Sequence, residues 1–189
     1  MDELRLDLRS GLPQALRVLL AEYPRDGWAT EPNFQGLVAF WLDRHMMFRR
    51  LLALMQADAE ALLNRSLEPE QFSSKLNRLG GMFVQDLHGH HQIEDQHYFP
   101  VLAAKEAGIA RGFEILDLDH HAIDRHLDRF VKGANAMLRC GPDRSAMQDS
   151  LGRFHTDLIQ LGGFLNRHLI DEEELIVPII LRHGAGSLG

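Results

Sequence analysis

The sequence predicts an all-α protein, an up-down-up-down antiparallel four-helix bundle with a short N-terminal helical arm. Glycines and prolines divide the chain into four long segments rich in helix-forming residues, and few stretches alternate as a half-buried strand does. Within each segment, apolar residues recur in alternating steps of four and three, which is the spacing of one helix face. Because the connections are short, we expect consecutive helices to be antiparallel neighbours.

The arm is predicted at residues 1–32 and the bundle at residues 33–189. In the arm, "LPQALRVLLAEY" predicts one short helix, followed by a turn at "PRDGW". The last long helix is expected to follow a turn at Gly141 and Pro142. The four long helices are predicted at residues 33–64, 69–106, 108–139 and 143–183.

Composition excludes several classes of function. A net charge of −7 without a basic stripe argues against a nucleic-acid partner, because phosphate contacts supply most of that affinity. The single cysteine, Cys140, excludes an intrachain disulfide, a cysteine zinc site and an iron-sulfur cluster. No apolar run is long enough for a membrane helix and no secretory signal is evident, so we expect a soluble, cytoplasmic protein.

Each predicted helix has an apolar seam, the stripe of residues spaced by four and three, and each seam becomes polar at one level. Counting from the predicted turns places these levels at similar heights in the bundle. We therefore expect the polar seam residues to converge on one layer of the core. They are His45 in the first helix, His90 and Glu94 in the second, His120 in the third, and His168 and Glu172 in the fourth.

An internal duplication supports this alignment. Residues 90–100, "HHQIEDQHYFP", and residues 168–178, "HLIDEEELIVP", share His at the first position, Glu at the fifth, an acid at the sixth and Pro at the eleventh. The seams of the first and third helices likewise superimpose with a shift of 75 residues, which matches His45 with His120. The prolines Pro100 and Pro178 are expected to bend or close their helices.

The polar layer predicts a metal centre. Buried carboxylates are costly unless they are paired, and the seams contain no Lys or Arg to pair with Glu94 or Glu172. A single core histidine is usually a hydrogen-bonded packing residue, but histidines at matching seam positions in all four helices favour ligation. Six nitrogen and oxygen ligands exceed what one tetrahedral ion takes, and carboxylates can bridge, so the pattern favours two metals.

The remaining histidines are weaker candidates. His88, His155 and His183 fall off the seams and are expected to be solvated or rim side chains, as is His121 in its simplest interpretation. Any further ligand is left open among five residues, each with a non-ligand interpretation beside it. These are His91, His97, His121, Asp124 and His126.

With these residues, the chain resembles the hemerythrin-like family, the HHE cation-binding domains, over residues 33–183. The family signature is two repeats of an isolated helix histidine followed by a H-x-x-x-E-[ED] helix that ends in Pro. The resemblance implies two iron ions in a non-haem di-iron centre with a bridging oxo or hydroxo group, in which Glu94 and Glu172 bridge and the four seam histidines are terminal ligands. Oxygen-carrying hemerythrins have a second histidine one turn along the third helix, where this chain has Asp124, so reversible oxygen carriage is not favoured.

The function implied by the resemblance is to bind or sense oxygen, nitric oxide or iron, with a small gaseous ligand or oxidant as the partner. Two alternatives stay open. One is a di-iron redox enzyme that reduces peroxide or nitric oxide, oxidises ferrous iron or repairs iron centres, and the other is a structural zinc or manganese bundle. A homodimer is compatible with the sequence but nothing in the spacing demands it.

Overall fold

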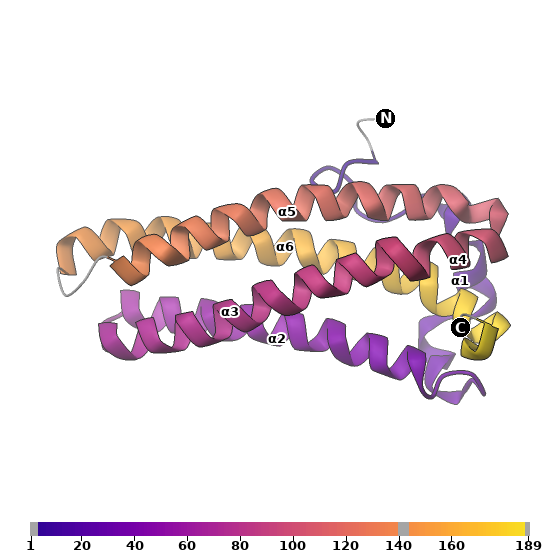
Figure 1. Cartoon of the computed structure of the whole chain (residues 1–189), viewed down its shortest axis with the longest axis horizontal. Coiled ribbons are helices and arrows are strands. Elements are labelled where there is room, and N and C mark those ends of the chain that lie inside the picture. The colour runs from indigo at the N-terminus through magenta and orange to yellow at the C-terminus, as the bar shows by residue number, and fades with distance from the viewer. Residues whose placement is uncertain (1–3, 140–143, 188–189) are drawn as a thin grey trace. The chain divides into compact units, whose positions relative to one another are not determined.

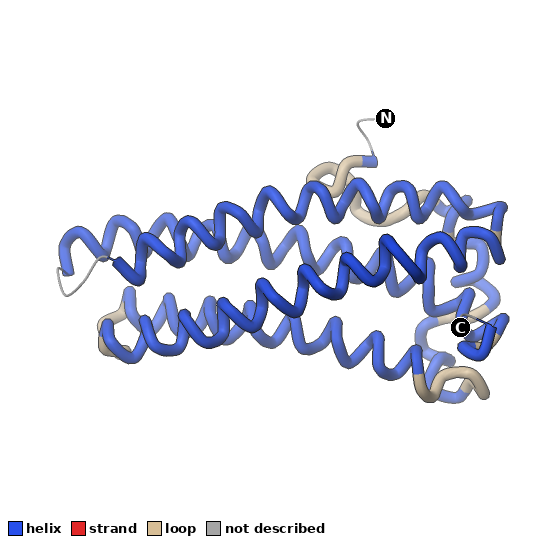
Figure 2. The backbone as a smooth tube through the Cα atoms, viewed as in Figure 1, coloured by secondary structure: helices blue, strands red, loops and turns tan. Residues whose placement is uncertain are grey.

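The computed structural model describes residues 4–139 and 144–187, and every regular element in these ranges is helical (Figure 1, Figure 2). The all-α class is therefore confirmed. The turn predicted at Gly141 and Pro142 lies outside the described residues. The long helices are α2 (Leu37–Leu63), α3 (Pro69–Ile93), α5 (Ala110–Arg139) and α6 (Arg144–His183).

The second predicted helix is not one continuous α-helix. It consists of α3, a π-helical turn at Glu94–Tyr98 and α4 (Phe99–Lys105). The backbone N–H of Phe99 donates to the carbonyl of Glu94, five residues back, so the turn holds one residue more than an α-helical turn. A change of register is favourable here because Pro100 has no N–H and its ring would clash with the carbonyl four residues back.

The π-helical turn moves the predicted seam by one residue. His97, predicted on the seam, is exposed, and Val101 is only half-buried. Phe99 and Leu102 occupy the core in their place. His97, which the sequence left open as a further ligand, is thus exposed, because a strict repeat of four and three does not continue through a widened turn.

The arm is helical in short pieces, whereas the sequence predicted a single short helix followed by a turn. These are the 3₁₀ helix Gln14–Leu16, α1 (Val18–Glu22) and the 3₁₀ helix Arg25–Thr30. The last of them covers most of the segment predicted as a turn.

The ends of the long helices follow common rules. α3 begins at Pro69, whose missing N–H is unpaired in a first turn in any case. α6 ends at His183, and Gly184, which follows it, has a φ of +75° and donates its N–H to the carbonyl of Ile180 at 2.8 Å. Pro178 does not close the fourth helix, since α6 continues through it to His183.

The chain forms two compact units, each assembled from separate segments. Unit 1 comprises Met1–Met46, His90–His121 and Asn166–Gly189, and unit 2 comprises Met47–Gly89 and Ala122–Leu165. Helices α2, α3, α5 and α6 each contribute residues to both units. The boundary predicted after residue 32 falls inside unit 1, so the division into arm and bundle stays a prediction.

Unit 2 has an apolar core centred on phenylalanines from the predicted seams. The ring centroid of Phe83 lies 6.4 Å from that of Phe48 and 5.8 Å from that of Phe130. Phe130 in turn lies 5.7 Å from Phe154. These separations are typical of favourable aromatic pairs, so packing alone accounts for this core.

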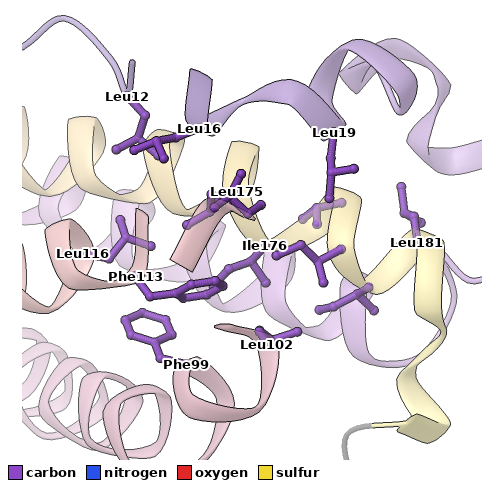
Figure 3. Packing of buried hydrophobic residues seen from close by; sticks show 14 of the residues in the cluster. Leu12, Leu16, Leu19, Phe99, Leu102, Phe113, Leu116, Leu175, Ile176 and Leu181 are labelled. Atoms are coloured by element: carbon purple, nitrogen blue, oxygen red, sulfur yellow. The ribbon is translucent and has the colours of Figure 1, made fainter. Parts of the chain in front are cut away.

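Unit 1 contains a second apolar cluster, to which the arm contributes. Leu12, Leu16 and Leu19 of the arm are buried together with residues of α4, α5 and α6, including Phe99 and Leu175 (Figure 3). Full burial of one such leucine contributes about 1.5–3 kcal/mol. The apolar side chains of the arm therefore hold it against the helices of unit 1.

Among the described residues, none of the helices has both the length and the apolar character needed to cross a membrane.

Candidate metal centre

The six side chains predicted as ligands all belong to unit 1, and all are buried or nearly so. The exposed fraction of the side chain is 8% for His90 and at most 4% for the other five. They come from every long helix and from the π-helical turn. His45 lies on α2, His90 on α3, Glu94 on the π-helical turn, His120 on α5, and His168 and Glu172 on α6.

Together with His91 of α3, these side chains form two groups within the described part of the chain, each able to hold a metal ion. One group is His91, His120 and His168, and the other is His45, His90, Glu94 and Glu172. Within each group, one potential ligand atom from every residue lies within 4.8 Å of all the others. In the second group the Nε2 atoms of His45 and His90 are 3.1 Å apart, so the two rings face the same point.

Glu94 joins the two groups through its two carboxylate oxygens. Its Oε1 lies 3.0 Å from Nε2 of His90, and its Oε2 lies 3.6 Å from Nε2 of His120. One oxygen is thus directed to each group. A carboxylate placed in this way can bridge two cations.

Glu172 repeats this arrangement from α6. Its Oε1 lies 3.4 Å from Nε2 of His45, and its Oε2 lies 3.4 Å from Nε2 of His168. The two glutamates come from the two copies of the sequence duplication. The duplication therefore supplies a matched pair of bridging positions.

Several buried atoms that face this region have no hydrogen-bond partner among the described residues. Buried polar atoms are normally hydrogen-bonded, and these are carboxylate oxygens and imidazole nitrogens, whose lone pairs can coordinate a metal. A cation would satisfy all of them at once, so the residues present fit a metal. The atoms are Oε1 and Oε2 of Glu94, Oε2 of Glu172, and Nε2 of His91, His120 and His168.

Three of the histidines are oriented by a carboxylate on the opposite side of the ring. In each, Nδ1 contacts the carboxylate and Nε2 faces the candidate ligands. An outer carboxylate of this kind fixes the tautomer of a metal-binding histidine and raises its basicity. The pairs are His45 with Glu173 at 3.0 Å, His120 with Asp95 at 2.8 Å, and His168 with Asp119 at 3.4 Å.

The electrostatics of the two glutamates also favour a cation. Burial raises the pKa of Glu94 well above its ordinary value, and the charge of Glu172 raises this pKa further. Burial acts in the same direction on Glu172, but the charge of His45 and its contacts with the neighbouring histidines outweigh it and hold its pKa well below the ordinary range. A cation is needed for both carboxylates to remain ionised together.

Burial affects the histidines as well. It lowers the pKa of His90 to about 3 and the pKa of His91 well below its ordinary value. For His168, burial would lower the pKa, but the contact with Asp119 and the negative charges of Asp119 and Glu172 outweigh it and raise the pKa to about 9. His90 and His91 are thus neutral, which is the form that binds metals.

Trp41 has a role that its seam position did not reveal. Its Nε1 donates a hydrogen bond to Oε1 of Glu172, and its ring lies edge-on to Tyr98 with centroids 4.8 Å apart. The sequence predicted only apolar packing for this residue. The one available signal was its position one turn before His45 on the same helix face.

Of the five residues left open as further ligands, the structure brings His91 to the site. Its ring stacks on His120 with centroids 4.0 Å apart and planes 9° from parallel. His97, His121 and Asp124 are exposed. His126 is half-buried in unit 2, where it packs against Phe164. His91 was not singled out because the seam count followed only one face of α3, on which His90 already lies.

The histidines predicted as solvated or rim residues lie away from the candidate ligands. His88, His121 and His183 are exposed, and His155 is half-buried in unit 2 with its Nε2 3.2 Å from Glu60. None of these four residues therefore belongs to either group of candidate ligands.

A family model, the hemerythrin HHE cation binding domain, matches residues 36–180. No curated protein and no solved structure gives a significant match to the chain. The family match covers every residue of both candidate groups and leaves out the whole arm. The resemblance noted from the two repeats is thus confirmed, and the chain belongs to the hemerythrin HHE cation-binding domain family.

Proposed function

We propose that unit 1 holds a non-haem di-iron centre, with which the protein binds or senses oxygen, nitric oxide or iron itself. The observation that supports this is the set of buried lone-pair atoms without hydrogen-bond partners, arranged as two groups that Glu94 and Glu172 join. We place this centre in an up-down-up-down antiparallel four-helix bundle, the topology predicted from the short connections.

The ligands divide unequally between the two ions. His45 and His90 would hold one ion, and His91, His120 and His168 would hold the other. Glu94 and Glu172 would bridge them, together with an oxo or hydroxo group. Because one ion has fewer histidines, it keeps more positions for a small ligand. A bound iron pair supplies one-electron redox chemistry and a site for a diatomic molecule.

The chain surrounds these ligands with groups that exclude water and fix orientation. Phe99 stacks on His120 with centroids 5.4 Å apart, and Trp41 donates to Glu172. The carboxylates behind His45 and His168 are themselves paired with arginines, so neither serves as a free proton donor. Two of the three carboxylates behind the histidines are thus held in ion pairs, which favours binding or sensing over turnover.

A di-iron redox enzyme is the second candidate, and one observation favours it. Tyr98 is half-buried and contacts Trp41, which donates to Glu172. Two oxidisable rings thus lead away from the candidate ligands. A structural zinc or manganese bundle is the third candidate, because nitrogen and oxygen ligands also suit those metals.

The first test is metal analysis of the purified full chain, followed by anaerobic loading with Fe²⁺ and titration with oxygen, nitric oxide and peroxide. We expect two irons per chain and a reversible change in the absorption spectrum. Repeated consumption of one oxidant would identify an enzyme instead. Zinc or manganese without a response to these ligands would identify a structural site, and one metal or none would rule out the di-iron centre.

The second test is the double substitution Glu94→Ala and Glu172→Ala, which removes both carboxylates that join the groups. We expect this variant to lose iron binding. The control is His155→Ala, since His155 contacts Glu60 in unit 2 and none of the candidate ligands. Wild-type iron content in the double variant would show that these residues are not ligands.

A further inference from the structure

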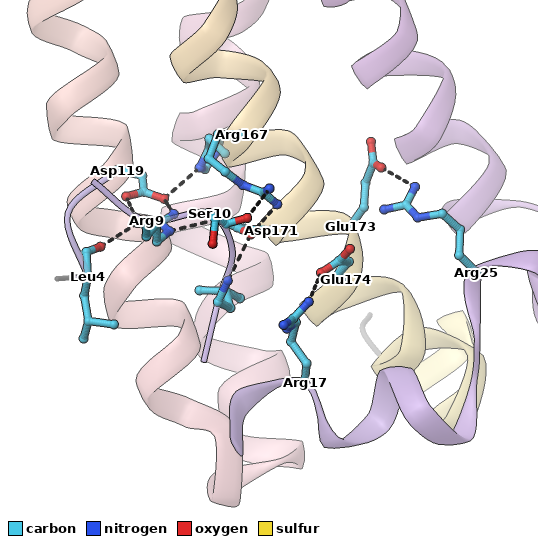
Figure 4. A network of polar contacts seen from close by, with 12 residues as sticks. Leu4, Arg9, Ser10, Arg17, Arg25, Asp119, Arg167, Asp171, Glu173 and Glu174 are labelled. Carbon is cyan, nitrogen blue, oxygen red and sulfur yellow. Dashed lines mark hydrogen bonds and ion pairs between the residues drawn. The ribbon is translucent and has the colours of Figure 1, made fainter. Parts of the chain in front are cut away.

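The arm belongs to the same compact unit as the candidate ligands and contributes charged side chains to it. Arg9 and Arg25 both reach carboxylates that lie behind ligand histidines (Figure 4). Both arginines lie outside the region matched by the family model, which begins at residue 36. The family match therefore assigns them no role.

Arg9 is almost completely buried, with a side-chain exposure of 2%. Its Nη1 donates to Oδ1 of Asp119 at 2.8 Å, and its Nη2 donates to Oδ2 of the same carboxylate. Its Nε donates to Oδ2 of Asp171 at 2.8 Å, and Nη1 also donates to the carbonyl of Leu4 at 2.8 Å. The guanidinium thus holds two buried carboxylates in fixed positions, which a lysine cannot do with a single nitrogen.

One of these carboxylates faces a ligand histidine. Oδ2 of Asp119 lies 3.4 Å from Nδ1 of His168 and is also the atom that accepts from Arg9. Asp119 therefore lies between the guanidinium of Arg9 and the outer nitrogen of His168.

Asp171, the second carboxylate held by Arg9, connects the arm to α6. Its Oδ1 accepts from Nη2 of Arg167 at 2.6 Å and from the backbone N–H of Leu12 at 3.2 Å (Figure 4). Asp171 precedes Glu172, so the contact that docks the arm lies next to a candidate bridging residue. The position of the arm and the position of α6 are thereby coupled.

Arg25 makes the equivalent connection to the other group of ligands. Its Nη1 donates to Oε2 of Glu173 at 2.7 Å, and Oε1 of Glu173 lies 3.0 Å from Nδ1 of His45. Here the arginine side chain is 44% exposed and makes a single contact with the carboxylate. The connection requires a positive charge at this point but not the fork of a guanidinium.

We propose that the N-terminal arm supports metal binding, with Arg9 and Arg25 as positioning residues that orient His168 and His45. Each arginine holds the carboxylate that directs the Nε2 atom of its histidine to one of the two ion positions. This inference rests on the proposed metal site and adds that the affinity of each position depends on docking of the arm. Loss of such outer partners typically weakens metal binding about 10–100-fold.

Arg17 provides a matched control within the same arm. Its Nη1 lies 3.1 Å from Oε2 of Glu174, also on α6. Glu174 follows Glu173 in sequence, but its Oε2 accepts a hydrogen bond from Arg17 (Figure 4). Substitution of Arg17 therefore removes a contact between the arm and α6 without touching the carboxylates behind His45 or His168.

The test measures Co²⁺ and Zn²⁺ affinity of the full chain by competition with a chromophoric chelator. We expect Arg25→Met to lower the affinity for one of the two bound ions about 10–100-fold, and Arg17→Met to leave both affinities unchanged. Arg25→Lys should restore most of the affinity, because the lost contact is a single charged hydrogen bond. Arg9→Lys should not restore wild-type affinity, because one ammonium cannot replace four hydrogen bonds in a buried fork.

A spectroscopic measurement separates positioning from a general loss of stability. In the Zn²⁺-loaded protein, the ring Nδ1–H of His45 should give a slowly exchanging NMR signal that exchanges faster in Arg25→Met. The same signal should be unchanged in Arg17→Met. Because Arg25 is partly exposed, its variants are expected to fold even if the Arg9 variant does not.

The outcomes also separate this inference from the proposed metal site. Two ions bound by the wild-type chain, with equal affinities in Arg25→Met and Arg17→Met, would overturn the role of the arm and leave the metal site intact. Failure of the wild-type chain to bind metal would overturn both.

Discussion

Units 1 and 2 are built from segments of the same four long helices, but different side chains fill the equivalent seam positions. In unit 2 the seams supply Phe48, Phe83, Phe130 and Phe154, which pack ring against ring. One seam position away on α2, in unit 1, His45 replaces an apolar residue. The same helical period therefore supports either an apolar core or a layer of ligands.

This difference has an energetic consequence. The apolar core of unit 2 needs nothing but its own packing, whereas the buried carboxylates of unit 1 are unfavourable until a cation is present. We therefore expect stability to depend on metal in unit 1 and on side-chain volume in unit 2. Four experiments test that contrast.

The largest expected effect is in unit 2. Phe130→Ala removes a ring that is 2% exposed and lies between Phe83 and Phe154, and it should lower the free energy of unfolding by about 3–5 kcal/mol. Urea denaturation measures this loss. The folded variant should still bind two irons, and a reduced iron content would show that the core of unit 2 also controls the metal centre.

Removal of metal should act mainly on unit 1. With free metal at 100 to 1,000 times its dissociation constant, binding stabilises the folded chain by about 2.7–4.1 kcal/mol. Hydrogen exchange should show faster exchange at residues 90–121 and 166–183 after chelation, with little change at residues 47–63 and 122–139. Equal acceleration in both sets would contradict the contrast between the units.

Replacing a buried acid of unit 1 by an apolar residue should make its core more like that of unit 2. The substitution Glu94→Leu removes a buried carboxylate whose two oxygens have no hydrogen-bond partner, and it should stabilise the metal-free chain by about 1–3 kcal/mol while weakening metal binding. Thermal unfolding of the metal-free proteins measures the gain. Glu60→Leu is the control, because that side chain is 58% exposed and should give no such gain.

The smallest effect on stability is expected at His97. This side chain is exposed, so His97→Ala should change the free energy of unfolding by no more than about 0.5 kcal/mol and leave both ions bound. His91→Ala is the contrasting variant. It removes a buried nitrogen from the three-histidine group. The affinity for one of the two ions should therefore fall by more than the roughly 10–100-fold that is typical when an outer partner is lost. Equal metal affinity in the two variants would show that His91 is not a ligand.

The sequence by itself determined the helical class, the family and the level at which polar residues are buried on the helix seams. The seam of α5 is an example, since Phe113, Leu116, His120 and Ile123 are all buried as predicted. This was possible because helical periodicity is local, and a polar residue on an apolar stripe stands out without knowledge of its neighbours. The duplication then linked Glu94 to Glu172 and His45 to His120.

Other features were decided only by the tertiary structure. Pro100 and Pro178 occupy matching places in the two repeats, yet a π-helical turn precedes Pro100 whereas α6 continues through Pro178. That turn exposes His97, and the packing of α3 against α5 stacks His91 on His120. Neither result follows from spacing, because each depends on which hydrogen-bond register and which ring contacts are more favourable in the assembled core.

The contacts of the arm are the features that the sequence predicts least well. Arg9 meets Asp119 across 110 residues and Asp171 across 162, and each of these charges alone has the appearance of an ordinary surface residue. Periodicity fixes which face of a helix is buried, but it does not say which distant segment covers that face. Only the folded chain brings Arg9 and Arg25 to the carboxylates behind His168 and His45, because that pairing results from tertiary packing of the arm's leucines and not from any local pattern.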